Sequence, residues 1–257
     1  MSAITITTKR APQVAITSDI RYCIASTRAE RSAAFRLVYH ADLRTGLGEA
    51  NDREMRVTPY HLLPTTDVFL ATRDGQVIFT LTLIVDGKLG LPMEVVYPEE
   101  IAARRQDGLL IGEVCCRADR RPGFRGSLPV FVRLCRLLAQ YARFHRLDAL
   151  VVACHPGHAR FYQRYLDFRA MGGERSYPGV QNQPAVALWL DFDRLRRERP
   201  ADGADYLGPP VAEAILRPQP MPSADQAYFA PLVASRCVVA GLSGESSGEA
   251  GQLVGTA

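Results

Sequence analysis

The sequence predicts an α/β fold in which one mixed β-sheet is flanked by helices. Runs rich in β-branched and aromatic residues alternate with segments of helical periodicity between residues 21 and 199. The composition is that of an ordinary globular domain, with 47% hydrophobic and 23% charged residues. The chain therefore contains enough apolar residues to bury a sizeable core.

Composition also excludes several classes of protein. The six cysteines are scattered and form no CxxC pair, so no disulfide framework is expected. The net charge of +4 comes without a basic stripe interleaved with aromatics, which argues against a nucleic-acid partner. No run approaches the roughly 20 apolar residues of a transmembrane helix, and the N-terminus lacks the apolar core of a signal peptide. We expect a cytoplasmic protein without a transmembrane segment.

The first part of the chain predicts a helix followed by a hairpin. Residues 1–20 are expected to form a flexible arm. Thr27 and Glu30 have capping-box spacing and should begin a helix through "AAFRLVYHADL". Residues 45–66 are turn-rich and polar, which indicates a long functional loop or lid. "DVFLAT" and "QVIFTLTLIVD", joined by "RDG", predict a β-hairpin.

The second part predicts alternating strands and helices. "GKLGLPMEVVYPEEIAARRQDG" indicates a turn, an extended piece and a short helix, and "LLIGEVCCRA" indicates a strand. Ser127 can cap a long helix, which precedes the buried strand "LDALVVAC" and the helix "HARFYQRYL". "FRAMG" and "AVALWLDF" are two further strands. A domain over 21–199 should end there, because residues 200–257 are rich in proline and small residues and are expected to be a largely disordered tail. Within that tail, "DQAYFAPLVASRCVVA" could fold back onto the domain or bind a partner.

The segment "CHPGHARFYQRYLDF" brings together a cysteine and two histidines. Cys154, His155 and His158 have zinc-ligating side chains, but no second cluster supplies a fourth ligand, so no metal is expected. A nucleophilic pair of Cys154 with a histidine is a second interpretation. A cysteine that ends an apolar strand is more often an inert core residue.

The same segment supports a third interpretation through resemblance. "HARFYQRYLDF" resembles the "AxxFYxxxGF" segment of the GCN5-related N-acetyltransferases, with Asp167 in place of the glycine. "IGEVCCRADRRPGFRGS" resembles their central strand and pyrophosphate loop, R/Q-x-x-G-x-G/A, with one residue inserted. The resemblance implies a GNAT-like mixed central sheet flanked by helices. It also implies a phosphopantetheine-binding loop, a site for phosphate at a helix N-terminus. That loop contains Arg120, Gly123, Arg125 and Gly126.

A narrower resemblance covers about residues 20–195. "AAFRLVYH", "PTTDVFLATRDGQVIFTLTLIVDGKLGLPME" and "LLIGEV" look like the long-chain N-acyl amino acid synthases of the FeeM type, relatives of the acyl-homoserine-lactone synthases. The lactone synthases carry an E-x-x-R motif on this strand, whereas here Cys116 stands in the arginine's place and Arg117 follows. The resemblance implies transfer of a long acyl chain from an acyl carrier protein thioester to the amino group of an amino acid. It implies no tightly bound cofactor, only an acyl thioester donor, for which acyl-CoA is the alternative to the acyl carrier protein.

Glu113 is the candidate general base. An ammonium must lose a proton before it attacks a thioester, and a carboxylate on the central strand can accept that proton. Glu113 is flanked by Ile111, Val114 and Cys115, so a charged residue here is unusual and indicates function. The alternative is that Glu113 is a solvated strand residue. Backbone N–H groups at the end of this strand could stabilise the oxyanion.

Further roles are assigned by the resemblance. Tyr162, or Tyr165 because of the inserted residue, would protonate the departing thiolate. Arg36 or Arg117 would bind the acceptor's carboxylate through a guanidinium fork. An apolar slot for the acyl chain would have Met93 and Phe131 as walls. Purely structural roles are the alternative for all of these.

Two other functions remain open at this level. The first is a small-molecule N-acetyltransferase that uses acetyl-CoA, which an unaltered pyrophosphate loop would have supported. The second is a non-catalytic acyl-binding module on the same fold. Loss of Glu113 or of both tyrosines would have favoured that module, and all three residues are present.

Overall fold

One seven-stranded sheet forms the centre of the part of the chain that the computed structural model describes, residues 20–121, 128–198 and 208–233. Its spatial order is β1-β2-β3-β4-β5-β7-β6, and every neighbouring pair is antiparallel except β4 and β5. The strands are β1 (Ile20–Ile24), β2 (Thr66–Arg73), β3 (Gln76–Val85), β4 (Ile111–Asp119), β5 (Ala149–Cys154), β6 (Arg169–Tyr177) and β7 (Gln183–Asp191).

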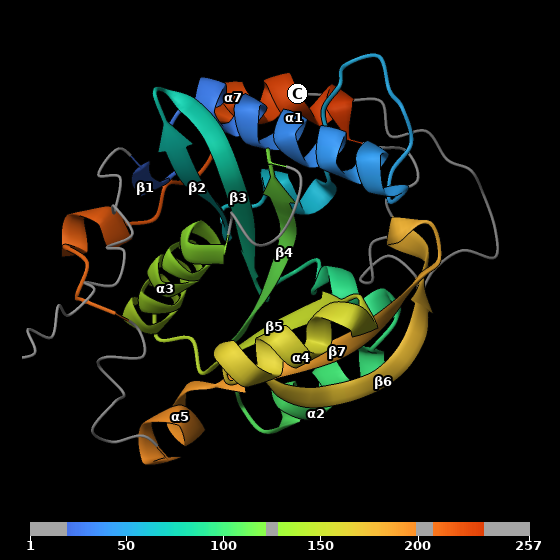
Figure 1. Cartoon of the computed structure of the whole chain (residues 1–257), viewed down its shortest axis with the longest axis vertical. Helices are drawn as coiled ribbons and strands as arrows, with labels where there is room; N and C mark the ends of the chain where they lie inside the picture. The colour runs from blue at the N-terminus through green and yellow to red at the C-terminus, as the bar shows by residue number, and fades with distance from the viewer. Residues whose placement is uncertain (1–19, 122–127, 199–207, 234–257) are drawn as a thin grey trace, which may run out of the picture.

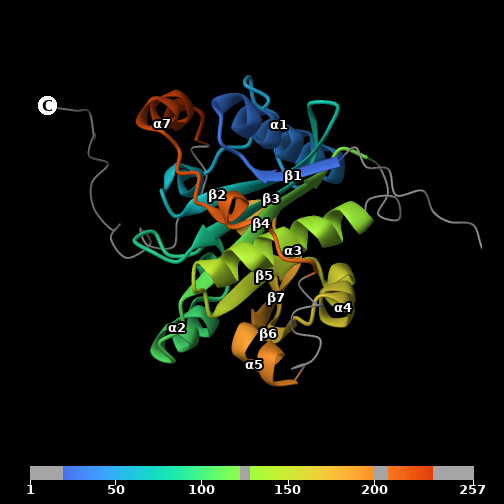
Figure 2. The same cartoon turned by 90° about the vertical axis from the view of Figure 1, so that its left-hand side faces the viewer.

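Helices cover both faces of this sheet (Figure 1, Figure 2). The α-helices are α1 (Arg28–Thr45), α2 (Pro98–Gln106), α3 (Leu128–Phe144), α4 (Pro156–Tyr165), α5 (Phe192–Glu198) and α7 (Ser223–Phe229). The 3₁₀ turns are η1 (Pro59–Leu62), η2 (Pro92–Val95), η3 (Pro178–Val180), η4 (Glu213–Leu216) and η5 (Ala230–Leu232). The mixed α/β fold predicted from the sequence is therefore confirmed.

Local sequence signals explain the first elements. The Thr27 hydroxyl accepts a hydrogen bond from the Glu30 backbone N–H, and the Glu30 carboxylate accepts one from the Thr27 backbone N–H. The helix α1 therefore starts with the predicted capping box. The predicted hairpin is β2 and β3, and its two turn residues, Asp74 and Gly75, both have positive φ. Such a turn suits the right-handed twist of the paired strands.

The core has three clusters on the two faces of the sheet. On one face, α3 and α4 pack over alternate strand residues such as Phe69, Leu150 and Leu188. On the other face, α1 packs over β2 and β4. The segment from η2 to α2 covers the ends of β4, β5 and β7 on that same side, with Tyr97 and Ile101 fully buried. The candidate base Glu113 lies on β4, between these clusters.

The pairing of β4 with β5 is short. Only Ile111, Gly112 and Glu113 pair with β5, opposite Ala149, Leu150 and Val151. Beyond Glu113 the two strands separate, and Figure 1 shows the β1–β4 half of the sheet diverging from the β5–β7 half. The sheet therefore contains a gap between two parallel strands, at the carboxyl end of both.

Two elements were missed in the sequence. Residue 20 was assigned to the N-terminal arm but begins β1, an edge strand paired with β2. The helix α5 follows β7 directly and was not predicted. Residues 1–19 of the predicted arm lie outside the described residues, as does Ser127, the predicted cap of α3.

The expectation of a disordered tail is wrong for residues 208–233. Leu216, Met221 and Phe229 are buried against the domain, and α7 lies alongside α1 (Figure 1). Asp225 forms ion pairs with Arg28 and Arg31 of α1, at 2.7 and 3.5 Å. Spaced apolar residues within a proline-rich segment suffice to anchor it, even though no helical or strand periodicity is visible. Residues 199–207, where the predicted boundary falls, and 234–257 lie outside the described residues.

None of the described helices is both long and apolar enough to cross a bilayer.

Candidate active site

The side chains of β4 point to two different compartments. Val114 and Arg117 face α3, since Val114 packs in that cluster and the Arg117 guanidinium lies 5.8 Å from the Phe131 ring centre. Glu113 and Cys115 face the opposite side, toward η2 and α2. A β-bulge interrupts the pairing with β3 between Thr80 and Thr82. The strand β4 separates the two compartments, and its pairing with β5 ends at Glu113.

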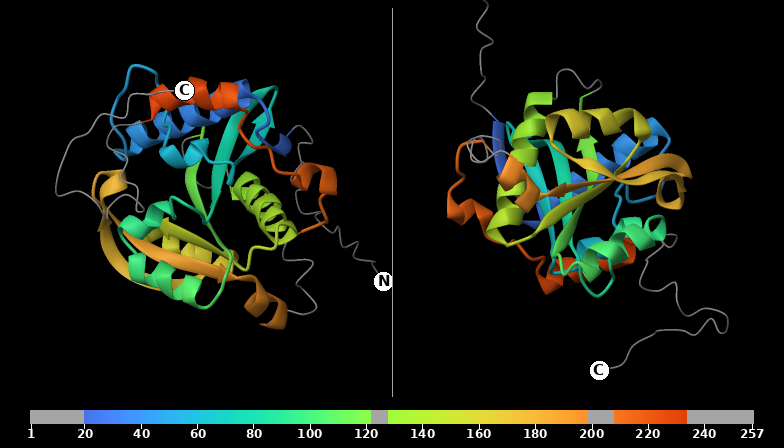
Figure 3. Two further views of the ribbon diagram at one scale, coloured as in Figure 1. Left: turned by 180° about the vertical axis from the view of Figure 1, so that it is seen from behind. Right: turned by 90° about the horizontal axis from the view of Figure 1, so that it is seen from below.

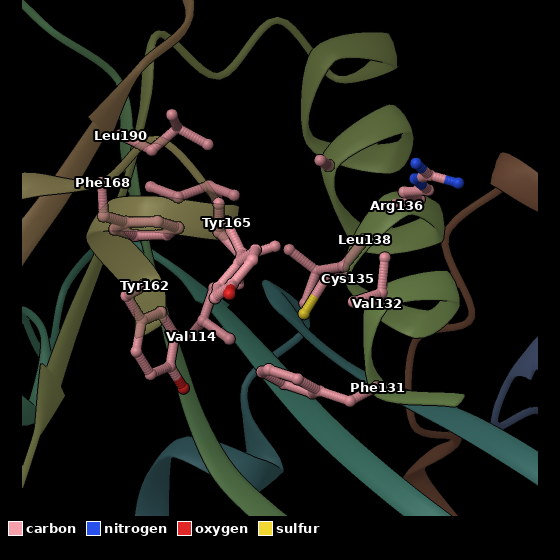
Figure 4. Close-up of a pocket in the computed structure, with 13 residues that line it drawn as sticks. Val114, Phe131, Val132, Cys135, Arg136, Leu138, Tyr162, Tyr165, Phe168 and Leu190 are labelled. Carbon is pink, nitrogen blue, oxygen red and sulfur yellow. The ribbon is translucent and has the colours of Figure 1, made fainter. Parts of the chain in front are cut away.

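An apolar cavity of about 700 Å³, its open mouth included, lies on the α3 side of the gap. It is bounded by β4, β5, α3 and α4, and Figure 4 shows side chains from both helices converging on it. The lining residues are Val114, Phe131, Val132, Cys135, Arg136, Leu138, Ala139, Leu150, Tyr162, Tyr165, Leu166, Phe168 and Leu190. Its mostly apolar lining is typical of a site for an apolar ligand.

Both candidate tyrosines line this cavity. Tyr162 is 8% exposed, and burial raises the pKa of its phenol, while the nearby Arg117 opposes that effect. Tyr162 is therefore a neutral O–H donor at physiological pH. Tyr165 is 58% exposed and stacks on Phe161 with ring centres 5.1 Å apart. Burial favours Tyr162 as the proton donor and places Tyr165 at the rim.

Glu113 is the buried carboxyl on the other side of the gap. Its side chain is 2% exposed, and Oε2 accepts a hydrogen bond of 2.8 Å from the Met93 backbone N–H. Burial raises its pKa to about 8, against the lowering effect of that hydrogen bond. On the α3 side of β4, Gly112 lets the core pack closely against the strand, because a Cβ there would lie 2.7 Å from Leu147 and 2.8 Å from Leu83. A base with a pKa near the working pH is suited to proton transfer.

Other polar groups gather around Glu113. Tyr177 of β6 is close enough for the Glu113 charge to raise the pKa of its phenol, after burial as the main cause. Cys115 and Cys116 follow on β4, and His61 of η1 lies against Cys116. These residues come from β4, β6 and η1, so the chain brings together groups that are far apart in sequence.

Arg56 ties the loop 46–58 over this cluster. Its guanidinium pairs with Asp42 of α1 at 2.8 Å and donates to the Gly179 carbonyl of η3 at 2.9 Å. Burial raises the pKa of Asp42 to about 6, although Arg56 acts in the opposite direction. The positive charge of Arg56 also acts on Cys115 and Cys116. The loop that the sequence indicated as functional thus places a cation beside the polar cluster.

The remaining predicted site residues divide into three groups. Phe131 lines the cavity. Met93 does not line it, because it is fully buried in the cluster on the opposite face and contributes its backbone N–H to Glu113. Arg36 is exposed on α1, between the buried Phe35 and Leu37, and the structure does not bring it to Glu113. Arg117 reaches the cavity side instead.

The predicted phosphopantetheine loop is largely beyond what the structure describes. Arg120 is exposed at the end of β4, and its backbone N–H donates to the Ile78 carbonyl at 3.0 Å. Gly123, Arg125 and Gly126 lie outside the described residues.

The histidine-rich turn before α4 has a capping role. His155 is the N-cap of α4, and its Nδ1 accepts from the Gly157 N–H at 3.1 Å. Burial raises the pKa of Cys154 to about 11, so this thiol is neutral and a poor nucleophile. Within the described residues, no group of three or more potential ligands is placed to hold a metal ion.

The comparisons with known proteins agree with this geometry. The family model described as N-acyl amino acid synthase FeeM matches residues 33–191. This chain belongs to the FeeM family. Significant matches are absent among curated protein sequences.

Solved structures support the assignment to the FeeM family. The N-acyl amino acid synthase FeeM from uncultured soil microbes is 26% identical, with a TM-score of 0.57 over 67% of this chain and 91% of that one. The acyl-homoserine-lactone synthase LasI is 19% identical, with a TM-score of 0.53 over 67% of this chain and 88% of its own. BjaI, a CoA-dependent acyl-homoserine lactone synthase, is 18% identical, with a TM-score of 0.55 over 83% and 99%.

Membership in the FeeM family makes this protein an N-acyltransferase, and its fold is GNAT-like. The resemblance found in the sequence is thereby confirmed. Three residues of the polar cluster, Arg56, His61 and Tyr177, were not found in the sequence. The polarity of residues 45–66 was the available signal for the first two. Tyr177 carries no local signal, because only the pairing of β6 with β7 places it near β4.

Proposed function

We propose that this FeeM-family protein transfers a long acyl chain from an acyl carrier protein thioester to the amino group of an amino acid. One observation carries the proposal: a buried carboxyl, Glu113, stands where β4 and β5 separate. An apolar cavity lies on one side of that gap and a polar cluster on the other. If the thioester carbonyl lies in this gap, its acyl chain can occupy the apolar cavity while the acceptor amino acid binds beside the polar cluster.

The cavity supports a long acyl group. The cavity lining is mostly apolar and comes from both α3 and α4, which suits a hydrocarbon chain better than an acetyl group. Filling it with methylene groups removes apolar surface from water, which favours binding by about 0.8 kcal/mol per CH₂. This favours a fatty acyl donor over acetyl-CoA.

The reaction follows from the residues on each side. Glu113 accepts the proton of the acceptor ammonium, and the free amine attacks the thioester carbonyl carbon. The new C–N bond forms while the carbonyl oxygen becomes an oxyanion, which backbone N–H groups at the bulge of β4 stabilise. The C–S bond then breaks, and the Tyr162 hydroxyl donates to the departing sulfur. Its raised pKa keeps that hydroxyl protonated until then.

Arg56 is our candidate for the acceptor's carboxylate. It belongs to the polar side of the gap, whereas Arg117 lies on the cavity side and Arg36 is exposed. A guanidinium fork binds a carboxylate with two parallel hydrogen bonds. Binding would exchange part of its contact with Asp42 for contact with the substrate. Arg117 is then available to the thioester end of the donor.

The carrier protein is expected to approach along α4. Arg160 and Arg164 are exposed on this helix, next to the rim residue Tyr165. Exposed arginines near the cavity mouth favour an acidic partner and would speed its association.

Mass spectrometry of lipid extracts from expressing cells tests the reaction. We expect N-acyl amino acids with long chains, absent from cells that express Glu113→Gln. Purified protein should turn over a long-chain acyl carrier protein thioester with a mixture of amino acids. Acetylation of amines from acetyl-CoA, with no use of long-chain thioesters, would overturn the proposal. Binding of the thioester without turnover of any acceptor would favour the non-catalytic module.

The acceptor assignment has its own test. Arg56→Lys keeps the charge but loses the fork, so we expect KM for the amino acid to rise about tenfold with kcat little changed. Arg53→Lys, an exposed residue of the same loop, is the matched control. An unchanged KM in Arg56→Lys would leave Arg56 with only its structural pairing to Asp42.

A further inference from the structure

Cys115 and Cys116 are adjacent in sequence yet share one side of β4. Successive side chains of a regular strand point to opposite faces. Here Cys116 has φ of 50°, in the left-handed region, at the bulge opposite Thr80 and Thr82. The bulge turns Cys116 toward the α1 side, where Cys115 already points. A non-glycine residue held in this conformation within a strand is a strained position of the kind found at functional sites.

The two thiols interact directly. Cys115 donates a hydrogen bond to the Cys116 sulfur, which raises the pKa of Cys115 and lowers that of Cys116. Both cysteines are reduced and partly exposed in the structure. The pair is therefore a dithiol in which Cys116 is the more acidic thiol.

His61 provides an independent observation at the same place. This side chain is 3% exposed, and its Nδ1 accepts from the Thr58 backbone N–H at 2.9 Å. The neutral ring therefore carries its proton on Nε2, a buried atom without a nitrogen or oxygen partner among the described residues. That N–H is directed at Cys116, whose pKa it helps to lower, together with the charge of Arg56. A buried donor aimed at a sulfur stabilises a thiolate.

We propose that Cys115 and Cys116 form a redox-sensitive dithiol that a hydroperoxide converts into an intramolecular disulfide, which stops acyl transfer. The Cys116 thiolate attacks a peroxide oxygen, so that an S–O bond forms, the O–O bond breaks and an alcohol or water departs. Cys115 then attacks the sulfenic sulfur, the S–S bond forms, and hydroxide leaves and takes the Cys115 proton as water. Two electrons pass from the two sulfurs to the peroxide.

The location of the two cysteines explains why their oxidation would stop acyl transfer. This part of the inference rests on the proposed function. The two cysteines follow Glu113 by two and three residues, at the bulge whose N–H groups would face the oxyanion. Adjacent residues are closer than the Cα separation that disulfides prefer, so ring closure must distort the backbone there. The same strain makes the bond easy to reduce, which makes the modification reversible.

Mass spectrometry tests the chemistry without any assay of activity. Trypsin cleavage after Arg105 and Arg117 yields one peptide that contains both cysteines. After treatment of the full chain with hydrogen peroxide, we expect this peptide to be about 2 Da lighter, and dithiothreitol to restore its mass. Cys115→Ser should stop at a sulfenic acid, about 16 Da heavier. Cys116→Ser should resist oxidation at low peroxide concentrations.

A second probe tests the dithiol geometry itself. Phenylarsine oxide bridges two neighbouring thiols and releases water, so it should add one phenylarsenic group to this peptide in the unmodified protein but not in either serine variant. Cys23→Ser, on the edge strand β1, is the matched control and should behave as the unmodified protein does. A peptide that gains oxygen without losing two hydrogens, and that does not bind the arsenical, would overturn the inference.

Activity is then measured on the same samples. Peroxide should abolish at least nine-tenths of the turnover of the unmodified and Cys23→Ser proteins, and dithiothreitol should restore it. If the protein keeps its turnover when the peptide with both cysteines is fully oxidised, the disulfide does not stop acyl transfer and this part of the inference is wrong. Absence of turnover before oxidation would instead contradict the proposed function, while the mass change would still stand.

Discussion

At the scale of the residue, the proposed chemistry depends on a single buried carboxyl, that of Glu113. Glu113→Gln keeps the shape of the side chain but cannot accept the ammonium proton, so we expect turnover to fall about 10²–10⁴-fold. Because the pKa of Glu113 is about 8, kcat/KM of the parent protein should rise with pH toward that value. The deficit of the variant should shrink at high pH, where the substrate amine is already neutral.

Turnover measured against pH for both proteins, with donor affinity measured in parallel, checks this expectation. Donor binding should be nearly unchanged, since the cavity lies on the other side of the gap. A variant with normal turnover at neutral pH would assign a structural role to Glu113.

The same carboxyl makes stability depend on pH. In the unfolded chain Glu113 loses its proton near pH 4.5, but in the folded protein it holds the proton up to about pH 8. The unfolded state binds fewer protons within this window, so the folded protein loses stability as pH rises from about 4.5 to 8. The loss from this one group is on the order of a few kcal/mol. Glu113→Gln removes it.

Chemical denaturation of both proteins between pH 5 and 9 measures the effect. The free energy of unfolding of Glu113→Gln should exceed that of the parent by a margin that grows with pH. Asp42, with its pKa near 6, titrates in both proteins and cancels in the comparison. A constant difference across the pH range would mean that Glu113 titrates normally.

At the scale of elements, we expect α3 and α4 to limit the length of the acyl group, because both line the cavity. Cys135 of α3 points into the cavity from the helix opposite Tyr165 (Figure 4), and burial raises the pKa of its thiol, so it acts as a small apolar residue. We expect Cys135→Phe to shift the preferred donor to shorter chains, because the added ring occupies part of the cavity.

Competition between donors of different chain length reveals this shift. Cys135→Ala, which leaves the cavity open, is the control and should keep the parent's preference. The larger side chain should cost about 1–3 kcal/mol of stability through overpacking. If both variants keep the parent's chain-length preference, the acyl group binds elsewhere.

At the scale of the whole molecule, the segment 208–233 is part of the folded domain. Figure 3 shows it from behind and from below, and its α7 lies against α1 while its first residues run past α3. Phe229 is fully buried and packs edge-on against Phe35, with ring centres 5.1 Å apart, and Phe35 in turn contacts His61 at 4.5 Å. Asp67 accepts from both Gln219 N–H and the Tyr141 hydroxyl. The segment therefore supports the loop that holds the polar cluster.

Phe229→Ala should destabilise the protein by about 3–5 kcal/mol, because it leaves a cavity in a fully buried position. Tyr228→Ala, at an exposed neighbour, should cost less than about 1 kcal/mol. Thermal and denaturant unfolding measure both. Truncation after residue 207 should be more damaging still, since it exposes the apolar surface that Leu216, Met221 and Phe229 cover. A truncated protein as stable as the full chain would show that these contacts contribute nothing.

The sequence by itself determined the order of the main elements and the family, and it indicated two candidate residues of the site. Local signals suffice for these, because a capping box, a turn dipeptide or alternation along a strand acts within a few residues. Glu113 could be predicted because a carboxyl within an apolar strand is conspicuous, and Tyr162 because its motif is contiguous. Local patterns do not predict the folded segment 208–233, because its few buried apolar residues have no regular spacing.

Only the tertiary structure decided which polar groups surround Glu113. Arg56, His61 and Tyr177 come from a loop, a 3₁₀ turn and a distant strand, and no spacing in the chain encodes their meeting. The side on which a residue of β4 lies also depends on the bulge, which turns Cys116 toward Cys115 where strict alternation would separate them. The physical reason is that burial and charge act through space, so groups distant in sequence fix the pKa of Glu113 and the reactivity of its neighbours.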